Sequence, residues 1–222
     1  MVAGMLAMFF IENLLPGGDQ LFFMCVIITV VVSITLHELA HGWAAIWQGD
    51  DTPREMGHMT ADPLVHMGGA SLVALVLVGI AWGMMPVNPN RFRDRRGDAL
   101  VAAAGPAMNI LLALISLTIL AIWLRTSGQV ETGPGHNLQQ LLYIFGVWNI
   151  VLALFNMVPV PPLDGSTVLG SFVPAYRRAI DRLPSPEMLF LMFFFVMMMA
   201  PPQYNLFSLG YKAASFYLGI FA

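Results

Sequence analysis

The sequence predicts an all-α polytopic membrane protein with about six transmembrane helices and one re-entrant or interfacial segment near residues 68–86. Hydrophobic residues make up 58% of the chain and charged residues only 10%, whereas a typical soluble domain has about 25% charged residues. The apolar residues also form long blocks, with the charges between them. The longest polar stretch, 48–67, has only 20 residues, so we treat 1–222 as a single membrane-embedded domain.

The apolar residues form seven blocks that are candidates for crossing a membrane. A full crossing needs roughly 20 residues, with about 17 as the lower limit. Three long blocks meet this limit easily, whereas the first block and the last two need tilt or local thinning of the bilayer. The seven blocks are 2–15, 20–47, 68–86, 98–124, 139–163, 187–200 and 204–221.

The positive charges predict the orientation of the chain. They gather in two connections, at Arg91, Arg93, Arg95 and Arg96 and at Arg177, Arg178 and Arg182. Both connections are expected on the cytoplasmic side, and the two blocks between them would form a hairpin that returns there. We expect a multi-pass protein of a cell membrane, prokaryotic by its compact architecture, that contacts the lipid bilayer. The scarcity of other cations argues against nucleic-acid binding, and the sequence leaves the oligomeric state open.

The main chemical signal is an HExxH motif inside block 20–47, formed by His37, Glu38 and His41. Ionisable residues inside a membrane are costly and indicate function. Residues four apart share one face of a helix, so both imidazoles can bind one Zn²⁺. Zinc lowers the pKa of a bound water from 15.7 towards about 7, and the adjacent Glu38 can take the proton.

A catalytic zinc site needs a third protein ligand and an open coordination position. The candidates are His58, His66, His136 and Asp164. Asp164 ends the segment 156–165, in which three prolines must interrupt or end the helix. Irregular backbone at membrane depth is tolerated where it lines a cavity, and a glycine follows Asp164 to allow a sharp turn.

These motifs resemble the site-2 protease family of intramembrane zinc metalloproteases, in the compact subgroup that lacks a PDZ domain. The resemblance covers about residues 34–170 and rests on HELAH at 37–41, NMVPVPPLDG at 156–165, GPAMN at 105–109, DPLVHMG at 62–68 and PVNPNRF at 86–92. It implies one Zn²⁺ per chain held by His37, His41 and Asp164, with Glu38 as general base and acid. It also implies that Asn156 positions the substrate.

The ligand positions make a prediction about topology. His37 lies in the C-terminal half of its block and Asp164 at the C-terminal end of block 139–163, so both blocks should run in the same direction. Residues 48–138 then contain an odd number of crossings. Because block 98–124 supplies one, block 68–86 should be re-entrant or lie at the interface; the alternative is an ordinary seventh span with zinc near the midplane.

The predicted function is hydrolysis of peptide bonds in or near the transmembrane segments of substrate proteins. One alternative is a membrane protein that binds zinc for transport or sensing, which does not require Glu38 beside the ligands. The other is a relative that binds helices without cutting them; such proteins typically lose a ligand or the glutamate, and this chain keeps all four residues.

Overall fold

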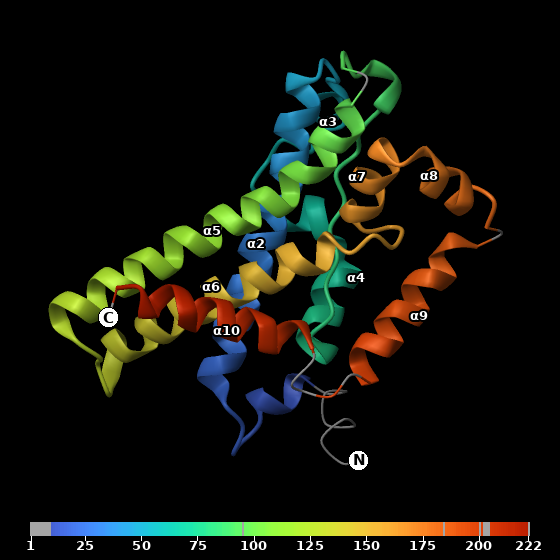
Figure 1. Ribbon diagram of the computed structural model, residues 1–222. Coiled ribbons are helices and arrows are strands. Elements are labelled where there is room, and N and C mark those ends of the chain that lie inside the picture. The colour runs from blue at the N-terminus through green and yellow to red at the C-terminus, as the bar shows by residue number, and fades with distance from the viewer. Residues whose placement is uncertain (1–9, 95, 184, 200, 202–204, 222) are drawn as a thin grey trace.

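The computed structural model describes residues 10–94, 96–183, 185–199, 201 and 205–221 (Figure 1). These residues form helices joined by turns and extended segments, and no β-strand occurs among them. The all-α prediction is therefore confirmed. The elements are η1 (Phe10–Leu14), α2 (Gln20–Trp47), α3 (Thr52–Glu55), α4 (Pro63–Val78), η2 (Pro89–Arg91), α5 (Gly97–Ser127), α6 (Gly133–Asn156), α7 (Asp164–Phe172), α8 (Pro174–Ile180), α9 (Pro186–Met199) and α10 (Leu206–Gly219).

Three of the described helices, α2, α5 and α6, are long and apolar enough to cross a membrane. They correspond to the three blocks that the sequence predicts most clearly. The prediction of about six spans is not confirmed, because α4 has 16 residues and α9 and α10 have 14 each. Most of block 2–15 lies outside the described residues, as does Arg95 of the first arginine cluster.

Helices α2, α5 and α6 form the centre of the molecule. Helices α5 and α6 make an antiparallel hairpin, with Ser116 donating to the Leu142 carbonyl at 2.7 Å. Helix α2 crosses this hairpin (Figure 1), and the C-terminal ends of α2 and α6 both lie towards α7. The predicted common direction of these two helices is therefore observed, and α5 runs back between them in the chain.

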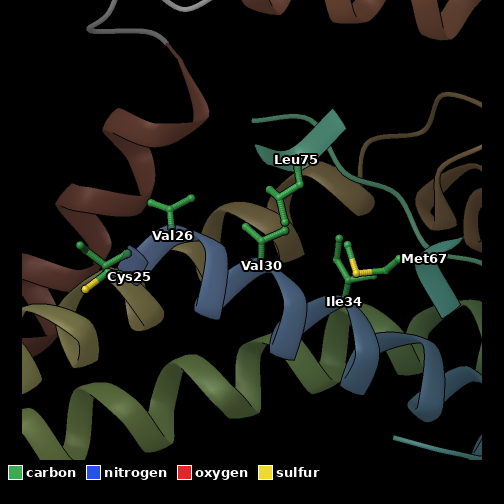
Figure 2. Close-up of a cluster of buried hydrophobic side chains, with 7 residues drawn as sticks. Cys25, Val26, Val30, Ile34, Met67 and Leu75 are labelled. Carbon is green, nitrogen blue, oxygen red and sulfur yellow. The ribbon is translucent and has the colours of Figure 1, made fainter. Parts of the chain in front are cut away.

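Helix α4 and the extended segment after it form a hairpin beside α2. Figure 2 shows Met67 and Leu75 of α4 packed on Ile34 and Val30 of α2, within one buried apolar cluster. The helix ends at Gly79, whose φ of 75° is the left-handed conformation that glycine adopts without strain. Helix α4 therefore runs antiparallel to α2 and stops near the N-terminal half of α2.

The chain then returns along α4 to the level at which it started. The Trp82 and Met84 amides donate to Ser71 Oγ at 2.9 Å and to the His66 carbonyl at 3.0 Å. Further on, the Asn88 amide donates to the carboxylate of Asp50, just beyond α2. Residues 63–88 thus leave and rejoin the same end of α2, as a re-entrant segment would; its depth in a bilayer stays a prediction.

Asp50 anchors this return. Its side chain has no exposed surface and accepts hydrogen bonds from the Asn88 amide at 2.6 Å and from the amide and hydroxyl of Thr52 at 3.0 and 2.5 Å. Burial raises the pKa of the Asp50 carboxyl, but these hydrogen bonds, with the Arg91 charge, outweigh it and hold the pKa below its ordinary value.

The arrangement of polarity is inverted relative to a soluble bundle. Along α5, the side chains of Asn109 and Ser116 are buried between helices, whereas large aliphatic side chains are exposed. A soluble helix would present the polar residues to water. Helix α5 is therefore built to place its apolar face in lipid. Its exposed aliphatic residues are Leu100, Ile110, Leu111, Leu114, Ile115, Ile119 and Ile122.

Candidate metal centre

The two histidines of the HExxH motif face one point from successive turns of α2. His37 and His41 are 6% and 8% exposed. Their Nε2 atoms lie 3.0 Å apart, as expected for side chains four residues apart on a helix. The two imidazoles thus point the same kind of atom at the same place.

Asp164 reaches this point from a different element, at the start of α7. Helix α6 ends at Asn156, and the proline-rich residues 157–163 carry the chain to the first residue of α7, which is Asp164. Its Oδ2 lies 3.2 Å from His37 Nε2 and its Oδ1 lies 3.5 Å from His41 Nε2. The ligand atoms of these three residues all lie within 4.8 Å of one another.

Gly165 allows this approach for a reason that differs from the expected one. It is not among the glycines with positive φ, so it does not supply a sharp left-handed turn. Instead, a Cβ at this position would lie 2.7 Å from the Val158 carbonyl oxygen and closer still to Met157. The absence of a side chain therefore lets the first turn of α7 pack against the backbone just after α6.

The other nitrogen of each imidazole is held by a hydrogen-bond acceptor. His37 Nδ1 lies 2.6 Å from the Asn109 side-chain oxygen, and His41 Nδ1 lies 2.7 Å from the Val101 carbonyl. A nitrogen that faces such an oxygen carries the hydrogen, so each neutral imidazole presents the lone pair of its Nε2 to the shared point.

The converging atoms therefore suit a cation. Two imidazole lone pairs and a carboxylate repel one another unless positive charge lies among them. In agreement, Asp164 Oδ2 is buried and accepts no hydrogen bond within the described structure. Two nitrogens and one carboxylate are the three-ligand set of a catalytic zinc site with one open position, and the held Nδ1 atoms supply the outer hydrogen bonds that such ligands need.

Gly105 of α5 closes one side of the site. A Cβ on this residue would lie 2.5 Å from His37 Cε1 and from His41 Nε2, which real contacts do not allow. A glycine within a helix permits close packing against a neighbouring element. Here the neighbour is the pair of histidines, because the α5 backbone at Gly105 lies directly against their candidate ligand nitrogens.

Glu38 lies beside the ligands and next to the returning segment. Its side chain is 7% exposed, and a Cβ on Gly83 would lie 2.5 Å from its Oε1. Within the described part of the chain, no residue donates a hydrogen bond to its carboxylate. Glu38 is therefore a buried acid or base whose oxygens remain available to a water molecule or a substrate.

The remaining candidates lie away from the three converging atoms. His58 and His66 pack against each other, and His66, 3% exposed, has its Nε2 2.7 Å from the Thr60 carbonyl. His136 lies in the first turn of α6, at the far end of that helix. Asn156 donates to the Leu152 carbonyl of its own helix at 3.0 Å, and this contact alone does not assign it a role.

Comparisons with known proteins agree with the metal centre. The model of peptidase family M50 matches residues 25–132 and 131–200. A Bacillus subtilis protein named "Putative zinc metalloprotease YwhC" is 36% identical over 155 residues, covering 69% of this chain and 71% of its own. Rip2 of Mycolicibacterium smegmatis, with the same description, is 25% identical over 209 residues, covering 91% and 76%. No solved structure matches the chain.

Proposed function

The chain belongs to peptidase family M50, the site-2 protease family, and is a zinc-dependent protease; we propose that it cuts other proteins in or near their transmembrane segments. The observation that carries this proposal is the convergence of His37, His41 and Asp164 inside a bundle of apolar helices, with Glu38 adjacent. An active site enclosed by membrane-type helices acts on peptide bonds that reach it from the bilayer.

His37, His41 and Asp164 would hold one zinc ion per chain. When bound, the ion polarises the scissile carbonyl and lowers the pKa of the attacking water. The chain's own contribution is the rigid placement of three donor atoms. The two histidines are fixed by α2 and by their Nδ1 hydrogen bonds, and Asp164 is fixed by the packing of Gly165.

Glu38 would act as the general base and then as the general acid. It accepts a proton from the attacking water and passes this proton to the amine that leaves. Its place next to His37 on α2 puts its carboxylate at the edge of the three donor atoms. The backbone of Gly83 limits the space on its other side and restricts the carboxylate to few positions.

The substrate would bind in an extended form, because a helix shields its own amide bonds. The extended segment 80–88 passes Glu38 at Gly83 and offers backbone groups to which a substrate strand can add. Asn156 precedes the proline-rich segment that ends at Asp164, and we assign it to substrate positioning.

We place the site towards the cytoplasmic side of the cell membrane. His41 lies about 9 Å along the axis of α2 from its C-terminal residue, Trp47. The two arginine-bearing connections lie at this end, where Arg177 lies 3.5 Å from Asp98 at the start of α5. Positive charge gathered at one end of a bundle indicates the cytoplasmic face.

The test measures zinc content and cleavage of a generic transmembrane substrate with detergent-purified protein. Wild type is expected to hold about one zinc per chain; His37→Ala and Asp164→Ala lose both zinc and cleavage. Glu38→Gln keeps zinc and loses cleavage, which a transporter, a sensor or a non-cutting relative would not require. His136→Ala, distant from the site, is the matched control. Full zinc retention in Asp164→Ala would refute the ligand set.

A further inference from the structure

A line of buried polar side chains connects the three central helices behind His37. The Asn109 side chain of α5 donates to Asn149 Oδ1 of α6 at 2.9 Å. The Asn149 amide nitrogen donates to Ser33 Oγ of α2 at 2.8 Å and to the Phe145 carbonyl at 2.9 Å. Ser33 lies one turn before His37 on α2, so the three hydrogen bonds and this turn of α2 together form a closed circuit through the three helices.

Every member of this line is buried. Ser33, Asn109 and Asn149 have no exposed surface. A buried amide that leaves a donor or acceptor unmade costs about 1–3 kcal/mol, so each amide takes the orientation that satisfies its neighbours. The orientation of one amide therefore determines that of the next.

The Phe145 carbonyl determines which end of each amide donates and which accepts along the whole line. The Phe145 carbonyl can only accept, so the Asn149 nitrogen must face it, and the Asn149 oxygen must face Asn109. Asn109 then presents its nitrogen to Asn149 and its oxygen to His37 Nδ1. A hydrogen must lie on His37 Nδ1, and the lone pair of Nε2 is left for the candidate metal.

We infer that Asn109 and Asn149 are positioning residues that set the tautomer of His37, through an amide relay that starts at the Phe145 carbonyl. This inference rests on the proposed zinc site. His41 reaches the same result directly, because its Nδ1 faces the Val101 carbonyl. The α5 segment 101–109 thus orients both histidines of the site.

The relay matters because a free neutral histidine in water favours the opposite tautomer, with its hydrogen on Nε2. In that form, the nitrogen that faces Asp164 and His41 offers no lone pair to a metal ion. The relay keeps His37 in the binding form before zinc arrives. Removal of an outer hydrogen-bond partner of a metal ligand typically lowers metal affinity about 10–100-fold.

Two substitutions of Asn109 separate positioning from simple packing. Asn109→Leu keeps the number and branching of the side-chain heavy atoms and removes the acceptor, so zinc affinity, measured by competition with a chelator, is expected to fall about 10–100-fold. Asn109→Asp loses the donor to Asn149 but keeps an acceptor for His37, now a carboxylate of the kind that commonly supports zinc-bound histidines, so zinc affinity stays within about threefold of wild type even if the melting temperature falls. If Asn109 only packed the helices together, zinc affinity would follow the melting temperature in both variants.

Ser116→Ala is the matched control, because Ser116 also joins α5 to α6 by a buried hydrogen bond, to the Leu142 carbonyl, without a link to either histidine. It is expected to keep wild-type zinc affinity. An equal loss in Ser116→Ala and Asn109→Leu would overturn the inference, as would unchanged affinity in Asn109→Leu.

The tautomer itself is observable in zinc-free protein labelled with ¹⁵N-histidine, of which the chain has five. At a pH high enough to keep the zinc-free imidazoles neutral, wild type is expected to show His37 with a protonated Nδ1, assigned by comparison with His37→Ala. Asn149→Ala changes a side chain whose hydrogen bonds go to Asn109, Ser33 and Phe145 and not to a histidine. It is expected to shift this signal towards the Nε2–H form, and it tests the relay if Asn109 variants fold poorly. An unshifted signal refutes the relay alone; absence of zinc in wild type refutes the proposed function.

Discussion

Replacement of Gly105 by alanine gives the sharpest test of how closely α5 lies against the site. The added Cβ would lie 2.5 Å from His37 Cε1 and His41 Nε2, whereas ordinary Cβ contacts begin near 3.4 Å. The histidines or α5 must therefore move by roughly 0.9 Å, by subtraction, and a metal site tolerates only about 0.2 Å in its ligand distances. We expect zinc affinity to fall at least about 100-fold, the upper end of the range for outer-sphere changes.

The same change should not harm the helix itself, because alanine is favoured over glycine in a helix interior by about 1 kcal/mol. Gly146→Ala is the matched control: its Cβ would also lie 2.5 Å from a neighbouring side chain, but that neighbour is Leu117, far from the ligands. Zinc content and chelator competition are measured for both, with circular dichroism to confirm folding. Wild-type zinc affinity in a folded Gly105→Ala would refute the close placement of α5.

Three further changes test the surroundings of the site. Gly83→Ala brings a Cβ within 2.5 Å of Glu38 Oε1; cleavage should fall at least about tenfold while zinc remains, and equal loss of both would contradict the separation of the two roles. Asp50→Asn should lower the melting temperature at neutral pH, and because the folded pKa of Asp50 is depressed, its difference from wild type disappears as pH falls below about 4; a pH-independent difference contradicts this. Tyr176→Phe removes the hydroxyl that bonds Ser166 and donates to the Pro159 carbonyl; about a 1 kcal/mol loss of stability is expected, and no change in thermal unfolding would show that these bonds contribute little.

The sequence was most informative where the physics is local. The HExxH spacing predicts the shared face of His37 and His41 because the helix repeat is nearly four residues. Three prolines within four residues predict the end of α6, since each lacks an amide hydrogen for the helix and its ring clashes with the preceding turn. The return of residues 63–88 to the end of α2 was predictable because it follows from an odd number of crossings in residues 48–138. That number depends only on the direction of the long blocks.

The short C-terminal elements were less predictable. Blocks 187–200 and 204–221 are apolar enough to suggest spans, yet α9 and α10 have 14 residues each. Hydropathy records how apolar a segment is, but helix length depends on where the chain must turn to pack on its neighbours. Ala214 of α10, for example, is buried against the α5–α6 hairpin at Leu117 and Val147.

By itself, the sequence determined the chemistry of this protein: the apolar helices, the two histidines, the glutamate and the carboxylate after a proline-rich break. Tertiary structure alone decided which atoms of the two histidines and the carboxylate face one another at the candidate metal centre. His37 and Asn109 are 72 positions apart in the chain, and His41 and Val101 are 60 apart. Periodicity reports which face of its own helix a residue occupies, whereas the tautomer of each histidine depends on how α5 crosses α2, and that crossing is the joint result of packing among all three helices.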